Sequence, residues 1–174
     1  MDDDTLYTIV GCGKCGQRRV KNVRQLFYED LVVGMRFITP ARTIIEDDLL
    51  TFAKVSGDAH PLHVDEAYAA TTEFGRRIAH GPFGIALAIG RFCLLQEFDE
   101  TALMMLDVKN WKFLAPIFIG DHIHLDLEIS DKRLTRAGRG IVGRHFRLIK
   151  ADGSLAQEGH SAMVVKRRAE FTHF

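Results

Sequence analysis

Three side chains that can exchange protons at neutral pH lie within six positions of one another in the stretch VSGDAHPLHVDEAYA, residues 55–69. They are Asp58, His60 and His63. A carboxylate and an imidazole that face one cavity can hold a water molecule, take a proton from it and return a proton, which is general acid–base chemistry. Two imidazoles and a carboxylate could also bind a metal ion, or form an ordinary polar loop tied by Asp58 to backbone N–H groups. Spacing alone leaves these alternatives open.

A second candidate is Gly81, in the stretch AHGPFG, residues 79–84. This glycine immediately precedes a predicted buried helix, so its N–H would point outward with the helix dipole behind it. Such a donor can stabilise a carbonyl oxygen that becomes negative during a reaction. Pro82 has no N–H, which leaves Gly81 as the better single donor. The alternative is a glycine that serves only the turn.

Other histidines are weaker candidates. His122 and His124 share one face of a predicted strand with Asp126 and Glu128, so we expect a solvated outer surface there rather than a metal site. Three further histidines have no visible partner in the sequence and are expected to be isolated polar residues: His80, His145 and His160.

The elements that position these groups follow from the hydrophobic pattern. Residues 46–57 predict a short helix with an acidic first turn and Gly57 at its end. Residues 58–63 would be a loop, and residues 64–70 one or two helical turns. A longer helix is predicted from about Pro82 to about Glu97; it is apolar on nearly every side and should be buried nearly all round.

The remaining segments read as strands. Residues 121–133 alternate almost without error, so that four apolar side chains should face one way: Ile123, Leu125, Leu127 and Ile129. Strands are also predicted over 34–45 and in parts of 103–118, with a hairpin around Asp152-Gly153. One long helix followed by about four antiparallel strands predicts an α+β fold, in which the helix lies in the palm of a strongly curved antiparallel sheet.

Composition narrows the class of protein. The 174 residues suit one domain, and an apolar fraction of 47% with 26% charged residues is typical of a soluble globular protein. The 23 basic and 23 acidic residues balance, which argues against nucleic acid as a partner. No uncharged apolar run reaches the roughly 18 residues that a membrane span needs. The three cysteines form no disulfide framework, so we expect a cytoplasmic protein.

Residues 1–26 differ from the rest, with several glycines and a basic run, and are predicted to be a loosely ordered extension of a domain over 27–174. Cys12 and Cys15 form a C-x-x-C pair. No second pair completes a zinc site, and no strand–helix pattern follows, so no catalytic role is expected for this pair.

Two stretches carry a resemblance to a known family. FAKVSGDAHPLHVDEAYAATTEFGRRIAHG resembles the hydratase signature of the MaoC-like dehydratases, which include the (R)-specific enoyl-CoA hydratases, and FLAPIFIGDHIHLDLEI is similar to a second pattern of that family. The resemblance covers about residues 27–168. It implies the hot-dog fold, a long central helix wrapped by a curved antiparallel β-sheet. It also implies a homodimer or higher homo-oligomer that binds an acyl-CoA thioester near the subunit interface.

The resemblance implies a site and a reaction. Asp58 and His63 match the catalytic pair, and Gly81 matches the backbone donor to the thioester carbonyl, with no metal or redox cofactor. The implied reaction is reversible addition of water to a trans-2-enoyl-CoA, which gives the (R)-3-hydroxyacyl-CoA. His60 departs from the pattern, which has Asn there. We expect His60 to brace the loop, with a catalytic or substrate-shaping role as the alternative.

The sequence says less about the residues that contact the substrate than about the catalytic pair. Phe83 and Leu87 on the long helix are candidates for the acyl-chain site, whereas acyl length and branching cannot be read from the sequence. A charge argument offers five cations for the phosphates of CoA: Lys109, Lys112, Arg133, Arg136 and Arg139.

Two other functions are alternatives to a hydratase. A hot-dog thioesterase would hydrolyse the thioester, but such enzymes place a carboxylate on or beside the long helix, and residues 82–96 contain none. A non-catalytic acyl-CoA binding subunit would need no proton-transfer pair.

Overall fold

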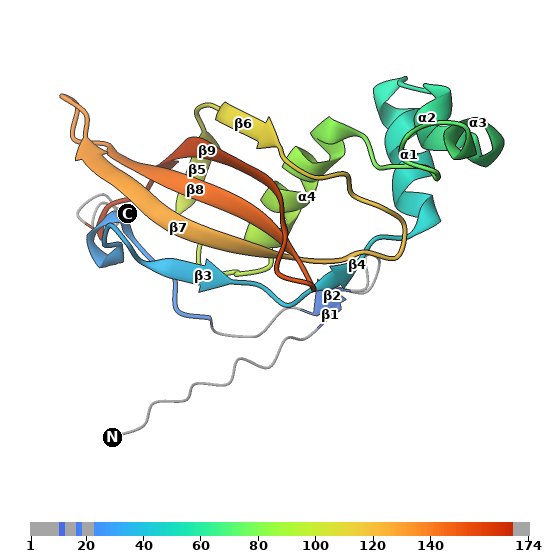
Figure 1. The fold of residues 1–174 in the computed structure, drawn as a ribbon. Coiled ribbons are helices and arrows are strands. Elements are labelled where there is room, and N and C mark those ends of the chain that lie inside the picture. Colours follow the sequence, from blue (N-terminus) through green and yellow to red (C-terminus); the bar gives the residue numbers. More distant parts are fainter. Residues whose placement is uncertain (1–10, 13–16, 19–22, 169–174) are drawn as a thin grey trace.

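A curved antiparallel sheet forms the body of the computed structural model, which describes residues 11–12, 17–18 and 23–168 (Figure 1). Its three long strands pair in the order β7 (His122–Leu134), β8 (Gly140–Lys150) and β9 (Leu155–Val165). The short strands β3 (Arg36–Ile38) and β4 (Arg42–Thr43) both pair with β7. At the other edge, β5 (Ala102–Met105) and β6 (Lys109–Phe113) both pair with β9.

The apolar alternation predicted for β7 is confirmed. Its four apolar residues are fully buried, each with 0% exposure: Ile123, Leu125, Leu127 and Ile129. The opposite face is polar, but the expectation that it is solvated is wrong at Asp126, which is only 3% exposed. Arg36 and Arg147 both bind the Asp126 carboxylate, so the charge is buried under two guanidinium groups. The hairpin between β8 and β9 is also confirmed, with Gly153 at φ 85°.

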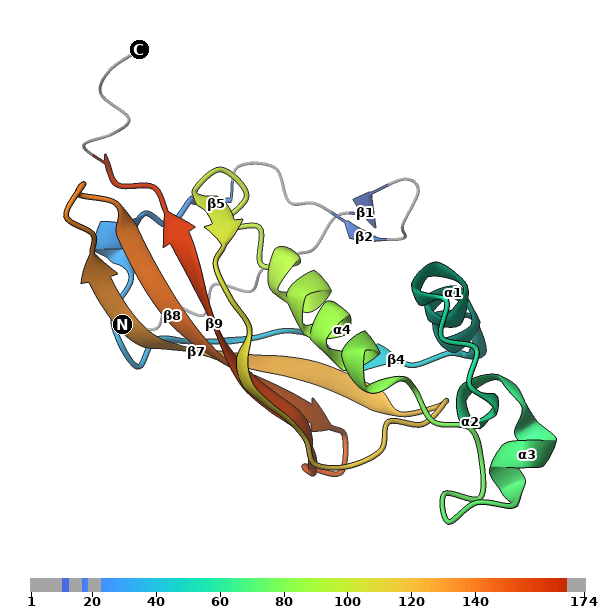
Figure 2. The ribbon, with the colours of Figure 1, turned by 90° about the horizontal axis from the view of Figure 1, so that it is seen from above.

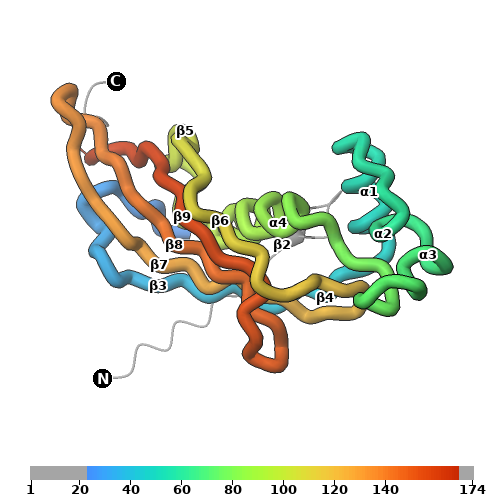
Figure 3. Tube along the Cα trace, turned by 45° about the horizontal axis from the view of Figure 1, so that its top comes forward, coloured from blue at the N-terminus to red at the C-terminus, as the bar shows by residue number. Residues whose placement is uncertain are grey.

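Helix α4 (Gly81–Cys93) crosses the concave face of this sheet, as predicted for an α+β fold (Figures 1 and 3). The prediction that it is buried all round is wrong. One face is buried in the core, whereas Pro82, Ala86 and Gly90 on the other face are exposed. The helix also ends at Cys93 rather than near Glu97, because the chain turns through Gln96 with a φ of 59° on its way to β5.

Three shorter helices gather beyond one end of the sheet: α1 (Glu46–Ser56), α2 (Pro61–Val64) and α3 (Glu66–Ala70) (Figure 2). The predicted end of α1 is confirmed, since Gly57 adopts a left-handed φ of 77° there. The loop predicted over 58–63 is shorter than expected. Pro61 starts α2 because a proline needs no hydrogen-bond acceptor in the first turn of a helix.

The strand predicted over 34–45 is divided in two. Thr39 still exchanges hydrogen bonds with Leu125 of β7, but Pro40 has no N–H to donate to the ladder. Strand pairing therefore stops after Ile38 and resumes at Arg42.

Most of the predicted N-terminal extension, including Cys15, lies outside the described residues. Within it, the backbones of β1 (Gly11–Cys12) and β2 (Gln17–Arg18) pair with each other. The last residues of this stretch are joined to the domain: Gln25 donates to Gln96 O, and Leu26 N–H donates to Glu97 O. A short 3₁₀ turn, η1 (Tyr28–Asp30), follows. None of the helices within the described ranges is long and apolar enough to cross a membrane.

Candidate active site

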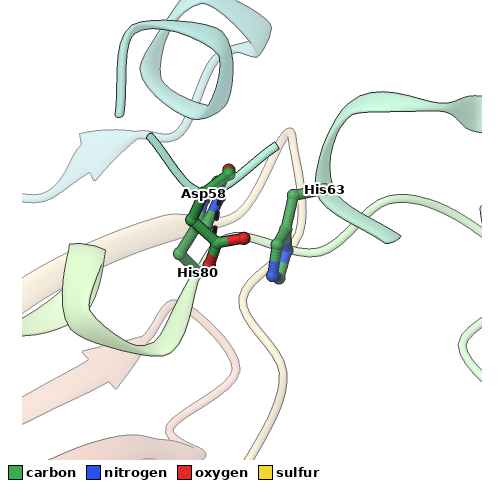
Figure 4. A group of neighbouring side chains, drawn as sticks. All are labelled: Asp58, His63 and His80. Carbon is green, nitrogen blue, oxygen red and sulfur yellow. Dashed lines mark hydrogen bonds and ion pairs between the residues drawn. The ribbon is translucent and has the colours of Figure 1, made fainter. Parts of the chain in front are cut away.

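Asp58, His63 and His80 meet where the α1–α2 connection lies against the start of α4 (Figure 4). At least one nitrogen or oxygen atom of each side chain lies within 4.8 Å of the others. His80 was expected to be an isolated polar residue, and this expectation is wrong: only 1% of it is exposed, and its ring lies 3.8 Å from that of His63, centroid to centroid. The sequence placed Asp58 and His63 together but missed the third member.

Each histidine is held by a hydrogen bond to a backbone carbonyl. His63 Nδ1 lies 2.8 Å from Ile78 O, and His80 Nε2 lies 2.9 Å from Asp58 O. A carbonyl oxygen only accepts, so both of these nitrogens carry the proton. In the neutral rings, His63 Nε2 and His80 Nδ1 are therefore the free acceptors. His80 Nδ1 is buried without a partner among the described residues.

The surroundings of His63 favour its neutral form. Burial is the main cause that lowers the pKa of its imidazole below the ordinary value, and the neighbouring His80 acts in the same direction. The bond to Ile78 O and the Asp58 carboxylate oppose this effect and raise the pKa. A neutral ring with a free Nε2 is the form that can accept a proton from water.

The Asp58 carboxylate is directed by its own loop. Asp58 Oδ1 accepts a hydrogen bond from His60 N–H at 3.2 Å, and Asp58 Oδ2 lies 4.0 Å from His80 Nε2. About half of this side chain, 52%, is exposed in the single chain. Two hydrogen bonds of about 2.8 Å span about 5.5 Å, so the separations within the group admit one bridging water.

His60 has the contact that a loop brace requires. Its Nδ1 accepts a hydrogen bond from Leu62 N–H at 3.2 Å, which caps the start of α2. An asparagine side-chain oxygen can make the same bond. The His60 ring lies 6.0 Å from that of His63, between His63 and the exposed Tyr68. His60 therefore positions the helical turn that carries His63.

Gly81 begins α4, and none of the described residues accepts a hydrogen bond from its N–H. A pocket of about 320 Å³ is lined by both Gly81 and His63, so the residues that carry this donor and the free acceptor border one cavity. A β-carbon at position 81 would lie 3.0 Å from the Phe113 ring, which favours glycine there.

Gln157 of β9 fixes the start of α4 and was not identified from the sequence. Its Nε2 donates to Gly81 O at 3.2 Å, while its Oε1 accepts from Trp111 Nε1 at 2.9 Å. Gly84 lets the helix approach this amide, because a β-carbon there would lie 2.1 Å from Gln157 Oε1. No local pattern could have identified Gln157, since it lies on a strand 76 positions away from Gly81.

The same three side chains could hold a metal ion in principle. Their arrangement favours a different occupant. The His63 and His80 rings lie face to face, tilted by 31°, with their centroids 3.8 Å apart. Each ring also uses one nitrogen on a carbonyl, so one nitrogen per ring remains as an acceptor, and that of His80 is buried.

The residues predicted to contact the acyl chain and CoA lie outside this group of three side chains. Phe83 and Leu87 are both buried and line a separate pocket between α1 and α4. Of the five cations considered for CoA, two are on β6, where Lys109 and Lys112 are exposed near Phe113 and paired with acidic neighbours. The other three are at the β7–β8 end of the sheet, far from α1–α3 in Figure 1: Arg133, Arg136 and Arg139.

Two further histidines expected to be isolated are also partnered. The rings of His145 and His160 stack at 4.5 Å with an angle of 4°, and His145 Nε2 lies 3.2 Å from Glu158 Oε2. They face each other across paired positions of β8 and β9. His122 Nδ1 is 2.9 Å from Thr43 Oγ1 on the exposed outer surface.

Comparison with known proteins gives a consistent result. Residues 30–145 match the family model described as a MaoC like domain. The chain is 35% identical over 109 residues to the 3-hydroxybutyryl-CoA dehydratase of Methylorubrum extorquens, covering 63% of this chain and 67% of that protein. It is 31% identical over 116 residues to the (R)-specific enoyl-CoA hydratase of Aeromonas caviae, covering 67% and 82%. Against Protein MaoC of Klebsiella aerogenes, the match spans only 31% of the relative's length.

Solved structures agree with the fold. An R-hydratase from Pseudomonas aeruginosa superposes with a TM-score of 0.72 at 31% identity, covering 84% of this chain and 89% of that one. A Mycobacterium tuberculosis protein described as having a double hotdog fold superposes at 0.72 with 18% identity, covering 82% and 44%, and shows the fold alone. The predicted hot-dog fold is thus confirmed. The matched residues 30–145 include the loop with Asp58 and His63 and all of α4, and the chain belongs to the MaoC-like dehydratase family.

Proposed function

We propose that this protein is a hydratase that adds water reversibly to a trans-2-enoyl-CoA and gives the (R)-3-hydroxyacyl-CoA. The observation that carries the proposal is the shared pocket of His63, which has a free proton acceptor, and Gly81, which has an unbonded backbone N–H. A thioester carbonyl on Gly81 would place the reacting double bond toward the histidine. The printed names of relatives, an enoyl-CoA hydratase and a 3-hydroxybutyryl-CoA dehydratase, support the same reaction class.

The chemistry follows from the protonation states. His63 Nε2 accepts a proton from a water molecule that Asp58 orients, while the water oxygen bonds to C3 of the enoyl group. Electrons move to the thioester oxygen, which Gly81 N–H stabilises with the α4 dipole behind it. The imidazolium then gives its proton to C2, so the elements of one water molecule are added and the catalyst is regenerated. Dehydration is the reverse sequence.

A thioesterase is a weaker candidate because α4 carries no carboxylate. Glu97 lies beyond its end, four positions after Cys93, and burial raises the pKa of this side chain. A binding protein without catalytic activity would not require the neutral His63 or the unbonded Gly81 N–H.

We expect Asp58→Asn and His63→Ala each to lower kcat for crotonyl-CoA hydration by about two to four orders of magnitude, because each removes a partner of the reacting water. The loss of enoyl absorbance measures hydration, and a thiol reagent measures thioester hydrolysis in the same samples. Thr43→Ala, on the outer surface, serves as a control with near-normal activity. Near-wild-type hydration by both site variants would refute the assignment, and thiol release would identify a thioesterase.

We also propose that no metal or redox cofactor takes part. Dialysis of the purified protein against a chelator should then leave hydration unchanged, with metal content measured in the same preparation. Activity that disappears and returns with a divalent ion would instead assign Asp58, His63 and His80 to a metal site.

The pH dependence should reflect His63. Because its pKa lies below the ordinary value of about 6.5, kcat/KM should remain high at pH 6.5 and fall only at lower pH, as the ring becomes protonated. Asp58→Asn should lower this pKa further, since it removes a negative charge that stabilises the imidazolium. NMR titration of the wild-type protein and of Asp58→Asn measures the pKa of His63 in each, and His63→Ala identifies the resonance of this ring. An increase of the pKa in Asp58→Asn would contradict the geometry.

His60→Asn should keep hydration within a few-fold of wild type, because the asparagine oxygen can accept the same bond from Leu62 N–H. His60→Ala removes that acceptor and should be less active and less stable. If His60→Asn lost as much activity as His63→Ala, His60 would have a direct catalytic role.

We propose a homodimer that forms along the β5–β6 edge. This edge exposes a row of large apolar side chains, each at least 42% exposed in the single chain: Leu103, Met104, Met105, Leu106, Phe113 and Leu114. An apolar edge strand of this kind favours pairing with a second copy. Sedimentation should give a dimer or higher oligomer, and Met104→Lys should shift it toward the monomer. A monomeric wild type would rule this interface out.

A further inference from the structure

A groove between α1 and α4 begins beside the active site. The pocket has a volume of about 300 Å³, and five of its lining residues provide apolar walls: Phe52, Val55, Phe83, Ala86 and Leu87. The Phe52 ring packs 5.1 Å from the ring of His80 and 5.8 Å from that of Phe83. The Phe52 and Phe83 rings therefore lie between the histidines and the groove, whose walls are α1 and α4.

Arg91 lines this pocket from the third turn of α4. It is only 8% exposed, yet no carboxylate within the described ranges binds it. Its Nη2 donates to Pro40 O, and its Nε is buried without a partner. Burial, and to a smaller extent the positive charge of Arg42, lower the pKa of Arg91. A buried guanidinium with a second cation nearby is unfavourable until an anion binds it.

The acidic residues of the pocket do not supply that anion. Asp48 binds Arg42 and also accepts a hydrogen bond from Ile45 N–H. Asp47 is exposed in the first turn of α1, where its Oδ1 lies 3.5 Å from the Thr51 hydroxyl. The charge of Arg42 is thus offset by Asp48, whereas that of Arg91 is not offset within the groove.

The separation of Gly81 and Arg91 along α4 sets the length of an acyl chain that could reach both residues. Arg91 follows Gly81 by ten positions, which is about 15 Å of helix axis, and an arginine side chain leans about one turn back toward the helix start. About 10 Å then separates the guanidinium from a carbonyl held at Gly81. An extended chain of roughly eight carbons covers this length.

We infer that the groove between α1 and α4 binds the acyl tail and that Arg91 binds a carboxylate at its far end, so that the preferred substrates are medium-length enoyl-CoA thioesters of dicarboxylic acids. The inference rests on the proposed hydratase function. Arg91 Nε–H and an Nη N–H offer the paired donors that a carboxylate binds. Gly81 holds the thioester end of the ligand, and Arg91 selects the other end.

The first test measures binding without turnover. Suberyl-CoA, a saturated eight-carbon dicarboxylic thioester, and octanoyl-CoA differ only at the far end of the chain. Calorimetry on the wild-type protein should show that suberyl-CoA binds at least about tenfold more tightly. Equal affinities, or tighter binding of octanoyl-CoA, would overturn the inference, and this comparison needs no variant to fold.

Variants then locate the preference. Arg91→Gln should abolish the preference for suberyl-CoA, because it weakens the binding of suberyl-CoA while octanoyl-CoA binds as before. Arg91→Lys keeps the positive charge and should keep part of the preference. Arg24→Gln is the matched control, since the Arg24 side chain is 77% exposed, pairs with Asp30 and does not line the groove. Thermal unfolding verifies that each variant is folded. A preference that survives in folded Arg91→Gln would show that another group binds the carboxylate.

Turnover separates this inference from the proposed function. Hydration of trans-2-octenoyl-CoA together with equal affinities for the two saturated ligands would retain the hydratase and reject the carboxylate site. A tenfold preference for suberyl-CoA without hydration of any enoyl-CoA would reject the hydratase and retain the site.

Discussion

The active site depends on two hydrogen bonds that join the α1–α2 connection to the segment before α4. His63 donates to Ile78 O, and His80 donates to Asp58 O, so each segment holds a histidine of the other. Because both acceptors are carbonyl oxygens, these bonds fix the tautomer of each ring as well as its position. The two rings then leave His63 Nε2 as an acceptor near a carboxylate, whereas the other acceptor, His80 Nδ1, is buried. If the two segments separated, neither the orientation nor the protonation state of His63 would be defined.

The sheet sets the position of the other half of the site. Gln157 on β9 joins the Gly81 carbonyl to the Trp111 indole on β6, so the first turn of α4 is held by two strands. Gly84 permits this contact because no side chain lies between helix and amide. A donor fixed in advance by packing need not reorganise as negative charge develops on a substrate oxygen. The packing of α4 on the sheet therefore fixes the position of the Gly81 N–H.

The two ends of helix α4 differ in chemical character. Its first residue presents an uncharged donor to the site, and its apolar middle packs on the sheet. Arg91, ten positions further on, presents a buried charge to the groove beside α1. The two ends lie about three helical turns apart. This separation is the basis of the proposal that one end takes part in the reaction and the other binds the far end of the acyl chain.

The sequence by itself determined the features that depend on neighbours along the chain. The alternation of β7, the end of α1 at Gly57 and the closeness of Asp58 to His63 are set by local spacing, and a hot-dog α+β fold follows from the order of elements and from the family resemblance. Only the tertiary structure decided the rest. His80 and Gln157 reach the site from other elements, and one face of α4 stays exposed because the sheet covers only the opposite face. Local periodicity identifies an apolar or a polar side chain, but sheet curvature and packing decide which distant group it meets.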